Sequence, residues 1–326
     1  MLWTIEAKGG YFDCGKAFGA ACAESIAYRL AREFRANAVE SYIEELKKVD
    51  ALCRTLYPEY VEELEGIAEG SGADYWSLLL LNTPELMERH QGCTTVAVSN
   101  ESEVYLVHNE DGNGNERSED CVILHYVLPN CSFYAFTYAG EIAGGSYSWN
   151  SHGLYFSVNY LKPIEIDFTG RVSRNFVARK VVEAKSIQDA ITVLEHGQDV
   201  SGYHYYMGQG TELVSIENFQ NEVSVKKVMG VDVHANHYLH EQFVDRASGK
   251  PNSLTRQKRA EELKQQGVDP LHMLADRANL PNAICTEFGD GLHTISTIGF
   301  YPKEHVIKLY EPETLKIEQE FPYEFK

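Results

Sequence analysis

The sequence lacks the features that bring a protein to membranes or nucleic acids. No apolar run approaches the roughly 20 residues that a bilayer-spanning helix needs. The segment MLWTIEAKGGYFDCGKAFG does not have the basic-then-apolar profile of a secretory signal. Basic residues are few, 29 against 48 acidic ones, and the net charge of −19 repels phosphate backbones and anionic lipids. We therefore expect a cytoplasmic protein without a membrane or nucleic-acid partner.

Paired cysteine motifs and nucleotide-binding motifs are also missing. The seven cysteines are an odd number without CxxC spacing, which argues against a disulfide framework and against a thiolate zinc site. Neither a P-loop motif nor a strand-linked G-x-G-x-x-G occurs. His234, His237 and His240 form H-x-x-H-x-x-H, but their surroundings are typical of a strand entering a turn, where the imidazoles would not converge. We expect no cofactor and no metal.

The pattern of apolar residues changes in the middle of the chain. Residues 14–87 repeat apolar positions every three or four residues, which predicts several helices. After Gly92, short runs rich in β-branched and aromatic residues predict strands. Further along, helices are expected at SRNFVARKVVEAK, SIQDAITVLEHG and SLTRQKRAEELKQQ, and strands at TELVSIEN, EVSVKKVM, TISTIGFYP and HVIKLYEP. This order of elements predicts a layered α+β fold.

Cys93 opens the β-rich part, directly after a glycine. A free thiol has a pKa of about 8.5 and needs a base to attack a carbonyl near neutral pH. If the chain is cut between Gly92 and Cys93, the new α-amino group, with a pKa of about 7.7 to 8.0, becomes that base. The thiol can make the cut itself by attacking the Gly92 carbonyl, which has no Cβ beside it to crowd the approach. The alternative is that Cys93 is one more small buried residue.

Several segments resemble the penicillin acyltransferase family of N-terminal-nucleophile hydrolases, which is related to bile salt hydrolases. In order along the chain, they are YPEYVEELEGIAEGSGADYWSLLLLNTPEL, GCTTVAVSN with VYLVHNEDGN, WNSHGLYFSVNYL, VSRNFVARKVVEAKSIQDAI and VHANHYL. The resemblance implies a four-layer αββα sandwich with an N-terminal helical propiece. It also implies cleavage of the chain before the Gly-Cys-Thr-Thr cysteine and chemistry on linear amide bonds.

The resemblance assigns roles to four residues. Cys93 matches the nucleophile, and Asp111 matches an aspartate that accepts from the Cys93 ammonium or orders the catalytic water. Asn236, in HANHY, matches the amide that stabilises the oxyanion. Asn150, in WNSHGL, matches an asparagine that supports the same oxyanion, with a strand-end cap as the alternative. Asp111 could instead cap the NEDGNG turn, and Asn236 could be an ordinary turn residue.

Two positions depart from the family pattern. Where bile salt hydrolases have an arginine shortly before the aspartate, this chain has His108. Near GLHTISTIGF there is no arginine to match a late catalytic or charge-compensating one. His108 or His293 could supply a positive charge only while protonated, which would make activity more sensitive to pH. The electrostatic support of the thiolate is therefore the weakest part of the resemblance.

The sequence thus predicts a self-processing cysteine amidohydrolase or acyltransferase that uses a thioester acyl-enzyme. Residues 1–92 form a propiece that stays docked after cleavage, and residues 93–326 form the catalytic domain. The partner is a small-molecule N-acyl amide. Two alternatives remain: a catalytically retired binding protein of the same fold, and an uncleaved thiol esterase that uses His108 as its base.

Overall fold

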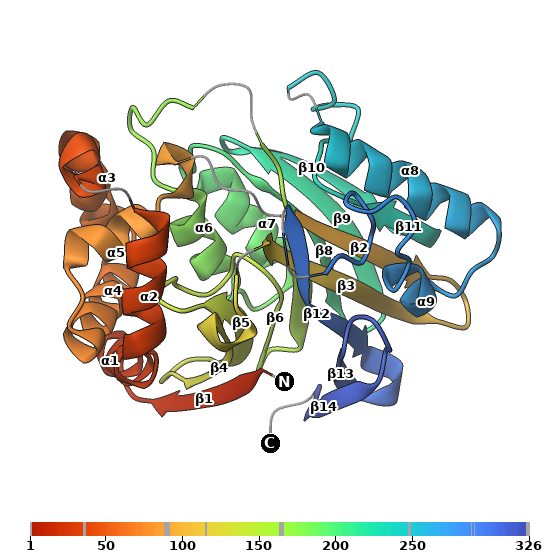
Figure 1. Cartoon of the computed structure of the whole chain (residues 1–326), viewed down its shortest axis with the longest axis horizontal. Coiled ribbons are helices and arrows are strands. Elements are labelled where there is room, and N and C mark those ends of the chain that lie inside the picture. The colour runs from red at the N-terminus through yellow and green to blue at the C-terminus, as the bar shows by residue number, and fades with distance from the viewer. Residues whose placement is uncertain are drawn as a thin grey trace.

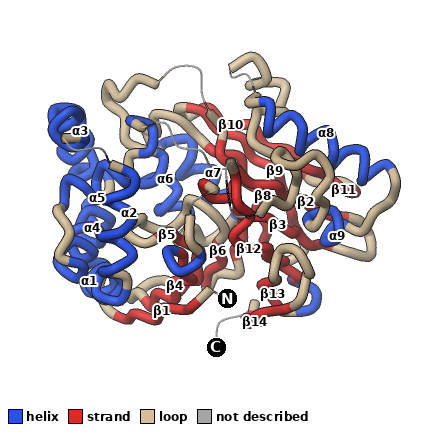
Figure 2. Tube along the Cα trace, viewed as in Figure 1, coloured by secondary structure: helices blue, strands red, loops and turns tan. Residues whose placement is uncertain are grey.

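The computed structural model of the chain describes residues 2–34, 37–87, 92–114, 116–162, 166–246, 249–287, 289 and 291–323. In this part of the chain two β-sheets pack against each other, and helices cover both outer faces (Figure 1). Figure 2 shows the strands gathered between a large helical layer on one side and a smaller one on the other. The predicted αββα layering is confirmed.

Over the described residues, the first sheet has eight strands in the order β1-β4-β5-β6-β7-β8-β9-β10. Their bounds are β1 (Trp3–Lys8), β4 (Cys121–Val127), β5 (Ser132–Tyr138), β6 (Ser148–Asn150), β7 (Leu154–Tyr160), β8 (Tyr203–Gln209), β9 (Glu212–Phe219) and β10 (Glu222–Lys227). The second sheet has six strands in the order β11-β2-β3-β12-β13-β14. Their bounds are β11 (Gly230–His234), β2 (Gly92–Ser99), β3 (Val104–Asn113), β12 (Leu292–Tyr301), β13 (Val306–Tyr310) and β14 (Ile317–Pro322).

The helices divide between the two outer layers (Figure 1). Those that pack on the eight-stranded sheet are α1 (Tyr11–Ala21), α2 (Ala23–Glu33), α3 (Ala38–Leu56), α4 (Pro58–Ser71), α5 (Tyr75–Leu81), α6 (Arg174–Val181) and α7 (Ile187–His196). Those that pack on the six-stranded sheet are α8 (Pro251–Gln265) and α9 (Pro270–Leu274). All helices predicted from the apolar periodicity are present.

Among the described residues, three large hydrophobic cores hold the layers together, beside a fourth cluster of four residues. The largest joins the first helical layer to the eight-stranded sheet and contains, for example, Leu64 and Phe156. A second, rich in aromatic residues such as Phe136 and Phe300, lies between the sheets. A third packs α8 and α9 on β2 and β3. Because burial of apolar surface drives folding, these cores fix the position of β2 and β3 between the layers.

The N-terminal part is not purely helical, contrary to the expectation of a helical propiece. β1 pairs in parallel with β4 over its whole length, from Trp3 opposite Val122 to Lys8 opposite Val127. A six-residue strand flanked by a helical pattern leaves little periodicity to detect. The strand joins the N-terminal part of the chain to the first sheet.

Glycines let α1 and α4 approach closely. A Cβ on Gly15 would lie 2.1 Å from the carbonyl oxygen of Glu63, and one on Gly66 would lie 2.2 Å from that of Phe12. Larger side chains at these positions would separate the helices. The glycines of the GIAEG segment therefore have a packing role.

All seven cysteines are buried free thiols, as expected for small core residues. In the described part of the chain, we found no helix with the length and apolar character needed to cross a bilayer.

Candidate active site

Cys93 is the second residue of β2, between β11 and β3 in the six-stranded sheet. In the antiparallel pairing of β2 with β3, Gly92 lies opposite Asp111 and Cys93 lies opposite Glu110. Since side chains alternate along a strand, Cys93 and Glu110 share one face while Thr94 and Asp111 share the other. The first face points toward the eight-stranded sheet and the second toward α8.

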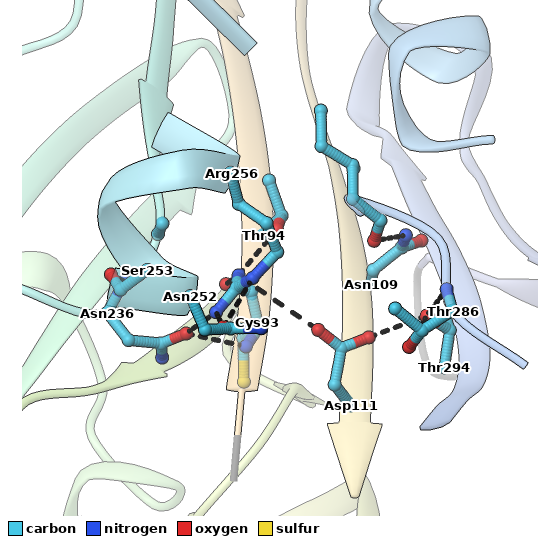
Figure 3. A network of polar contacts seen from close by, with 12 residues as sticks. Cys93, Thr94, Asn109, Asp111, Asn236, Asn252, Ser253, Arg256, Thr286 and Thr294 are labelled. Carbon is cyan, nitrogen blue, oxygen red and sulfur yellow. Dashed lines mark hydrogen bonds and ion pairs between the residues drawn. The ribbon is translucent and has the colours of Figure 1, made fainter. Parts of the chain in front are cut away.

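Asn236 holds the backbone nitrogen of Cys93. The Cys93 N–H donates to Asn236 Oδ1 at 2.9 Å (Figure 3). The Asn236 side-chain N–H donates to the Tyr160 carbonyl at 3.1 Å, and its backbone N–H donates to Ser253 Oγ at 2.7 Å. Asn236 follows β11, whose pairing with β2 brings it to this position. The structure thus brings together Cys93 and Asn236, which are 143 residues apart in the sequence.

The thiol of Cys93 faces a buried carboxylate. Cys93 Sγ donates to Glu110 Oε2 across 3.6 Å. Glu110 also accepts from the hydroxyls of Tyr138 and Ser146, each at 2.6 Å. His108 Nε2 lies 3.3 Å from the same Oε2 atom. The sequence interpretation did not single out Glu110, although strand alternation from Asp111 already places it on the face of Cys93.

The sulfur, imidazole and carboxylate of Cys93, His108 and Glu110 lie within 4.8 Å of one another, close enough to share a cation. A metal ion there would take the thiolate as a ligand. The chemistry proposed below uses these groups without a metal.

Arg256 supplies a positive charge that the sequence interpretation missed. It lies on α8, is 1% exposed, and donates from Nη1 to the Cys93 carbonyl at 2.5 Å and to Thr94 Oγ1 at 2.8 Å. Its Nη2 donates to Asn236 Oδ1 at 2.6 Å and to Asn252 Oδ1 at 2.9 Å (Figure 3). The structure places Ser253, Arg256, Ala260 and Leu263 on the buried face of α8. In the sequence, the nearby Lys258 and Arg259 obscure this face.

The side chain of Asp111 lies on the face of β2 and β3 that points toward α8. Thr294 donates to its Oδ1 at 2.7 Å, and Arg256 Nη1 lies 4.0 Å from its Oδ2. Oδ2 is buried and has no hydrogen-bond partner among the described residues. Burial raises the pKa of Asp111 to about 6, against the lowering effect of Arg256 and Thr294. A carboxylate oxygen without a hydrogen-bond partner among the described residues therefore lies close to the Gly92–Cys93 bond.

Gly92 fits this site because it has no side chain. A Cβ there would lie 2.4 Å from Leu292 Cδ1, 3.1 Å from Arg256 Nη2 and 3.2 Å from Asp111 Oδ2. The peptide before Cys93 is thus enclosed by the residues that surround the candidate nucleophile.

The electrostatics keep the Cys93 thiol protonated. Burial raises its pKa well above the ordinary value, and the Glu110 and Asp111 carboxylates raise it further, while Arg256 opposes them. Attack on a carbonyl therefore requires a group that takes the proton during the reaction. His293 does not supply a compensating charge, since burial lowers its pKa and its Nδ1 is 3.3 Å from the Glu116 carbonyl oxygen.

The structure does not bring Asn150 together with the other predicted residues. Its Nδ2 donates to the carbonyls of Val182 and Ala184, both at 2.8 Å, and its Oδ1 accepts from the backbone N–H groups of His152 and Leu154. Every polar atom of the amide is engaged with backbone. These contacts give no support to an oxyanion role and fit the alternative of a strand-end cap.

The three histidines of H-x-x-H-x-x-H take separate partners. His234 Nε2 contacts Glu217 Oε1 at 3.0 Å, His237 Nδ1 contacts Ser253 at 2.8 Å, and His240 Nε2 contacts Ser215 at 3.0 Å. These bonds account for the histidines as structural residues.

Comparison with known proteins gives the family. Residues 98–316 match the family described as acyl-coenzyme A:6-aminopenicillanic acid acyl-transferase. The chain belongs to this family. The matched range begins after Cys93 and includes Asp111, Asn236 and Arg256.

Two curated members are similar to this chain. The acyl-coenzyme A:6-aminopenicillanic-acid-acyltransferase 40 kDa form of Emericella nidulans is 26% identical over 278 residues, 80% of this chain and 76% of the relative. The β-alanyl-dopamine/carcinine hydrolase of Drosophila melanogaster is 28% identical over 160 residues. The latter match spans 43% of this chain and only 41% of the Drosophila protein.

Among solved structures, two variants of the conjugated bile acid hydrolase of Clostridium perfringens align with this chain. One has 10% identity and a TM-score of 0.44, and covers 71% of this chain and 92% of that one. The other has 11% identity and a TM-score of 0.35, and covers 72% and 85%.

Proposed function

We propose that this chain is a self-processing cysteine amide hydrolase or acyltransferase in which Cys93 is the nucleophile. The observation that carries the proposal is the arrangement around the Gly92–Cys93 peptide. Asn236 binds its nitrogen, Glu110 contacts the thiol, and Arg256 binds the Cys93 carbonyl. Such preorganised donors and acceptors are what acyl transfer requires.

Self-cleavage begins with attack of the Cys93 sulfur on the carbonyl carbon of Gly92. The bond from that carbon to the Cys93 nitrogen breaks, and the thiol proton ends on the released amine. Water then hydrolyses the Gly92 thioester, which restores the thiol and leaves a carboxylate on Gly92. The hydrogen bond from the Cys93 nitrogen to Asn236 supports this step because it orients the leaving nitrogen.

After cleavage, the α-amino group of Cys93 removes the thiol proton. The thiolate attacks an N-acyl amide, Asn236 with backbone N–H groups stabilises the oxyanion, and the amine product leaves with the proton. Asp111, through its free oxygen, accepts from the ammonium or orders the water. Water or a second amine then resolves the thioester, giving hydrolysis or acyl transfer.

The N-terminal piece stays docked after cleavage. Arg29 donates to Glu116 at 3.0 Å and to Glu141 at 2.7 Å, in a buried cluster that joins α2 to the catalytic part. Arg179 of α6 donates to Glu63 of α4 at 2.8 Å, with both side chains fully buried. Removal of one partner of a buried pair is strongly destabilising, so separation of the two chains is unfavourable.

The substrate class follows from the family and the relatives. The two curated relatives are named as a hydrolase of β-alanyl-dopamine and carcinine and as an acyltransferase of 6-aminopenicillanic acid. By analogy with these relatives, we propose that this chain acts on N-acyl amides of small amines. Its seven free thiols suit a reducing compartment such as the cytoplasm.

Trapping of the acyl-enzyme tests the proposal. Cleaved protein is incubated with a mixture of N-acyl amides, quenched in acid, and analysed by intact mass and peptide mapping. We expect an acyl adduct on Cys93 of the larger fragment and none in Cys93→Ala. Cys285→Ala is the matched control, since Cys285 is also a buried thiol, and it should keep the adduct. An adduct that persists in Cys93→Ala would contradict the assignment.

A further inference from the structure

We propose that Glu110 and His108 form a cation-binding subsite for the acyl group of the substrate, selecting short aminoacyl amides that carry an ammonium. The inference rests on the proposed function of Cys93. The subsite lies on the face of β2 and β3 that bears the thiol, since Glu110 Oε2 is 3.6 Å from Cys93 Sγ and 3.3 Å from His108 Nε2.

The hydrogen-bond network determines which atoms His108 presents. Asn159 Nδ2 donates to the His234 carbonyl at 3.3 Å, so Asn159 Oδ1 is the atom that faces Thr95. Thr95 donates its one hydroxyl hydrogen to that oxygen at 2.9 Å. Thr95 Oγ1 also lies 2.8 Å from His108 Nδ1, and it has no second hydrogen to donate. The Thr95 oxygen must therefore accept a hydrogen bond from a proton on His108 Nδ1. A neutral His108 then directs its Nε2 lone pair at Glu110.

Two acceptors consequently converge on one position beside the thiol. An imidazole lone pair and a carboxylate oxygen at 3.3 Å repel each other unless a cation lies between them. A substrate ammonium has three N–H donors and can bind both Nε2 and Oε2.

Acylation of Cys93 removes one hydrogen-bond donor from Glu110. In the free protein the thiol donates to Oε2, while the hydroxyls of Tyr138 and Ser146 donate to Oε1 and Oε2. A thioester has no S–H, so Oε2 loses one donor when the acyl group is attached. An ammonium on that acyl group replaces the lost donor. The replacement stabilises the acylated state specifically, because a buried carboxylate gains from each hydrogen bond to its charged form.

The length of the acyl group follows from this geometry. In a β-alanyl thioester the nitrogen is four bonds from the sulfur, and the chain can fold back toward an oxygen 3.6 Å from that sulfur. Because Cys93, His108 and Glu110 are buried, a short chain is favoured over a bulky one. A very small cavity nearby is lined in part by Tyr138 and Ser146, whose hydroxyls donate to Glu110. Glu141 also lines it, but its carboxylate is paired with Arg29 at 2.7 Å. On the face of β2 and β3 that bears the thiol, the carboxylate in contact with Cys93 Sγ is that of Glu110, whereas Asp111 lies on the opposite face.

The reaction on such a substrate moves the β-aminoacyl group from the amide nitrogen to Cys93 Sγ. The thiol proton leaves with the released amine, and water then frees the β-amino acid and restores the thiol. The acidic surface of the chain, with its net charge of −19, favours the approach of a cationic substrate.

Two amides that differ at one position test the inference. β-Alanyl and butanoyl amides of the same fluorogenic aminocoumarin carry an ammonium and a methyl group, respectively, at the end of the acyl chain. We expect cleaved wild-type protein to favour the β-alanyl amide about 10- to 100-fold in kcat/KM, as one charged hydrogen-bonded pair provides. Glu110→Gln should reduce this ratio about tenfold or more, whatever its absolute rates. Glu141→Gln, a second buried glutamate at the same pocket, should keep the ratio.

The possible results distinguish failure of the cation-binding subsite from failure of the proposed function of Cys93. Turnover of both amides with the butanoyl amide equal or preferred overturns the inference and leaves the function of Cys93 intact. Absence of turnover with both overturns the proposed function and this inference with it. If Glu110→Gln does not fold or cleave, the wild-type ratio alone decides, since the subsite predicts a preference for the ammonium before any substitution is made.

Discussion

The backbone N–H of Cys93 donates to the side-chain oxygen of Asn236 at 2.9 Å, and the same oxygen accepts from Arg256 at 2.6 Å. The nitrogen of the proposed scissile peptide is thus held by an amide that is itself fixed by a buried guanidinium. This relationship connects β2 to the segment after β11 and to helix α8, whose residues Asn236 and Arg256 are 143 and 163 positions from Cys93 in the sequence. The predictions below depend on it.

Asn236→Ala should slow both self-cleavage and acylation by about 100-fold or more, the usual cost of removing one oxyanion-hole donor. The variant loses the acceptor for the Cys93 nitrogen and the N–H donor for the oxyanion. Stopped time courses on denaturing gels measure cleavage, and burst kinetics measure acylation. Asn252→Ala is the control, since Asn252 contacts Arg256 and not Cys93. Equal losses in both variants would contradict a direct role of Asn236.

The buried carboxyl of Asp111 should give activity that rises with pH through about 6, because the ionised form is the one that accepts from the ammonium. Its effect on stability has the opposite direction. The folded-state pKa of about 6 exceeds the ordinary value of 3.8, so the folded protein binds this proton more tightly than the unfolded chain does. The free energy of unfolding therefore falls as pH rises from about 4 to 6, by up to about 3 kcal/mol.

Asp111→Asn provides the measurement. Urea unfolding of both proteins at several pH values between 4 and 8 gives the difference in stability, which should shift in favour of the variant as pH rises. The variant should also lose the rising limb of the activity profile. A difference that does not change with pH would show that Asp111 has no raised pKa.

Arg256→Met should raise the pKa of the Cys93 thiol further, since the positive charge of Arg256 lowers it. Alkylation of Cys93 by iodoacetamide at pH 8 should slow, and the free energy of unfolding should fall by about 3 kcal/mol or more, because Asp111 loses its cationic partner. Arg259→Met is the matched control on the same helix. Arg259 pairs with Asp276 at the partly exposed side of α8, where we expect a loss of about 1 kcal/mol or less. Similar effects from both would contradict the role of Arg256.

Asn150→Ala should reduce stability without changing the chemistry. The loss of four buried hydrogen bonds to backbone groups should lower the free energy of unfolding by about 2 to 4 kcal/mol. The acylation rate constant of the folded fraction should stay within about threefold of wild type. Loss of an oxyanion-hole donor would reduce it much more, by about 100-fold. Single-turnover kinetics with active-site titration make the comparison. A 100-fold slower acylation would restore Asn150 to the oxyanion site.

Local patterns predict the helices and strands, whereas the αββα layering and the candidate site residues Cys93, Asp111 and Asn236 come from the family resemblance. Apolar periodicity identifies the helices, and the Gly-Cys-Thr-Thr segment marks the start of β2. Arg256 was beyond that reasoning because its neighbours Lys258 and Arg259 make α8 resemble an exposed charged helix. Only tertiary packing shows which of these cations is 1% exposed.

Glu110 and Asn150 illustrate two other limits. Glu110 is next to the residue that the family resemblance indicates, and its contact with the thiol requires the register of β2 on β3. Asn150 was assigned by resemblance, which transfers a position but not its partners. The carbonyls that bind Asn150 belong to Val182 and Ala184, directly after α6, and their approach depends on how that helix packs on the sheet.

Mass spectrometry with N-terminal sequencing of catalytically active protein tests the central claim most directly. Self-cleavage predicts two chains of about 10 and 26 kDa, from 36.8 kDa × 92/326 and the remainder, with the second beginning Cys-Thr-Thr. Cys93→Ala should yield one uncut chain. Active wild-type protein that consists of a single full-length chain would contradict the account and favour an uncleaved thiol enzyme.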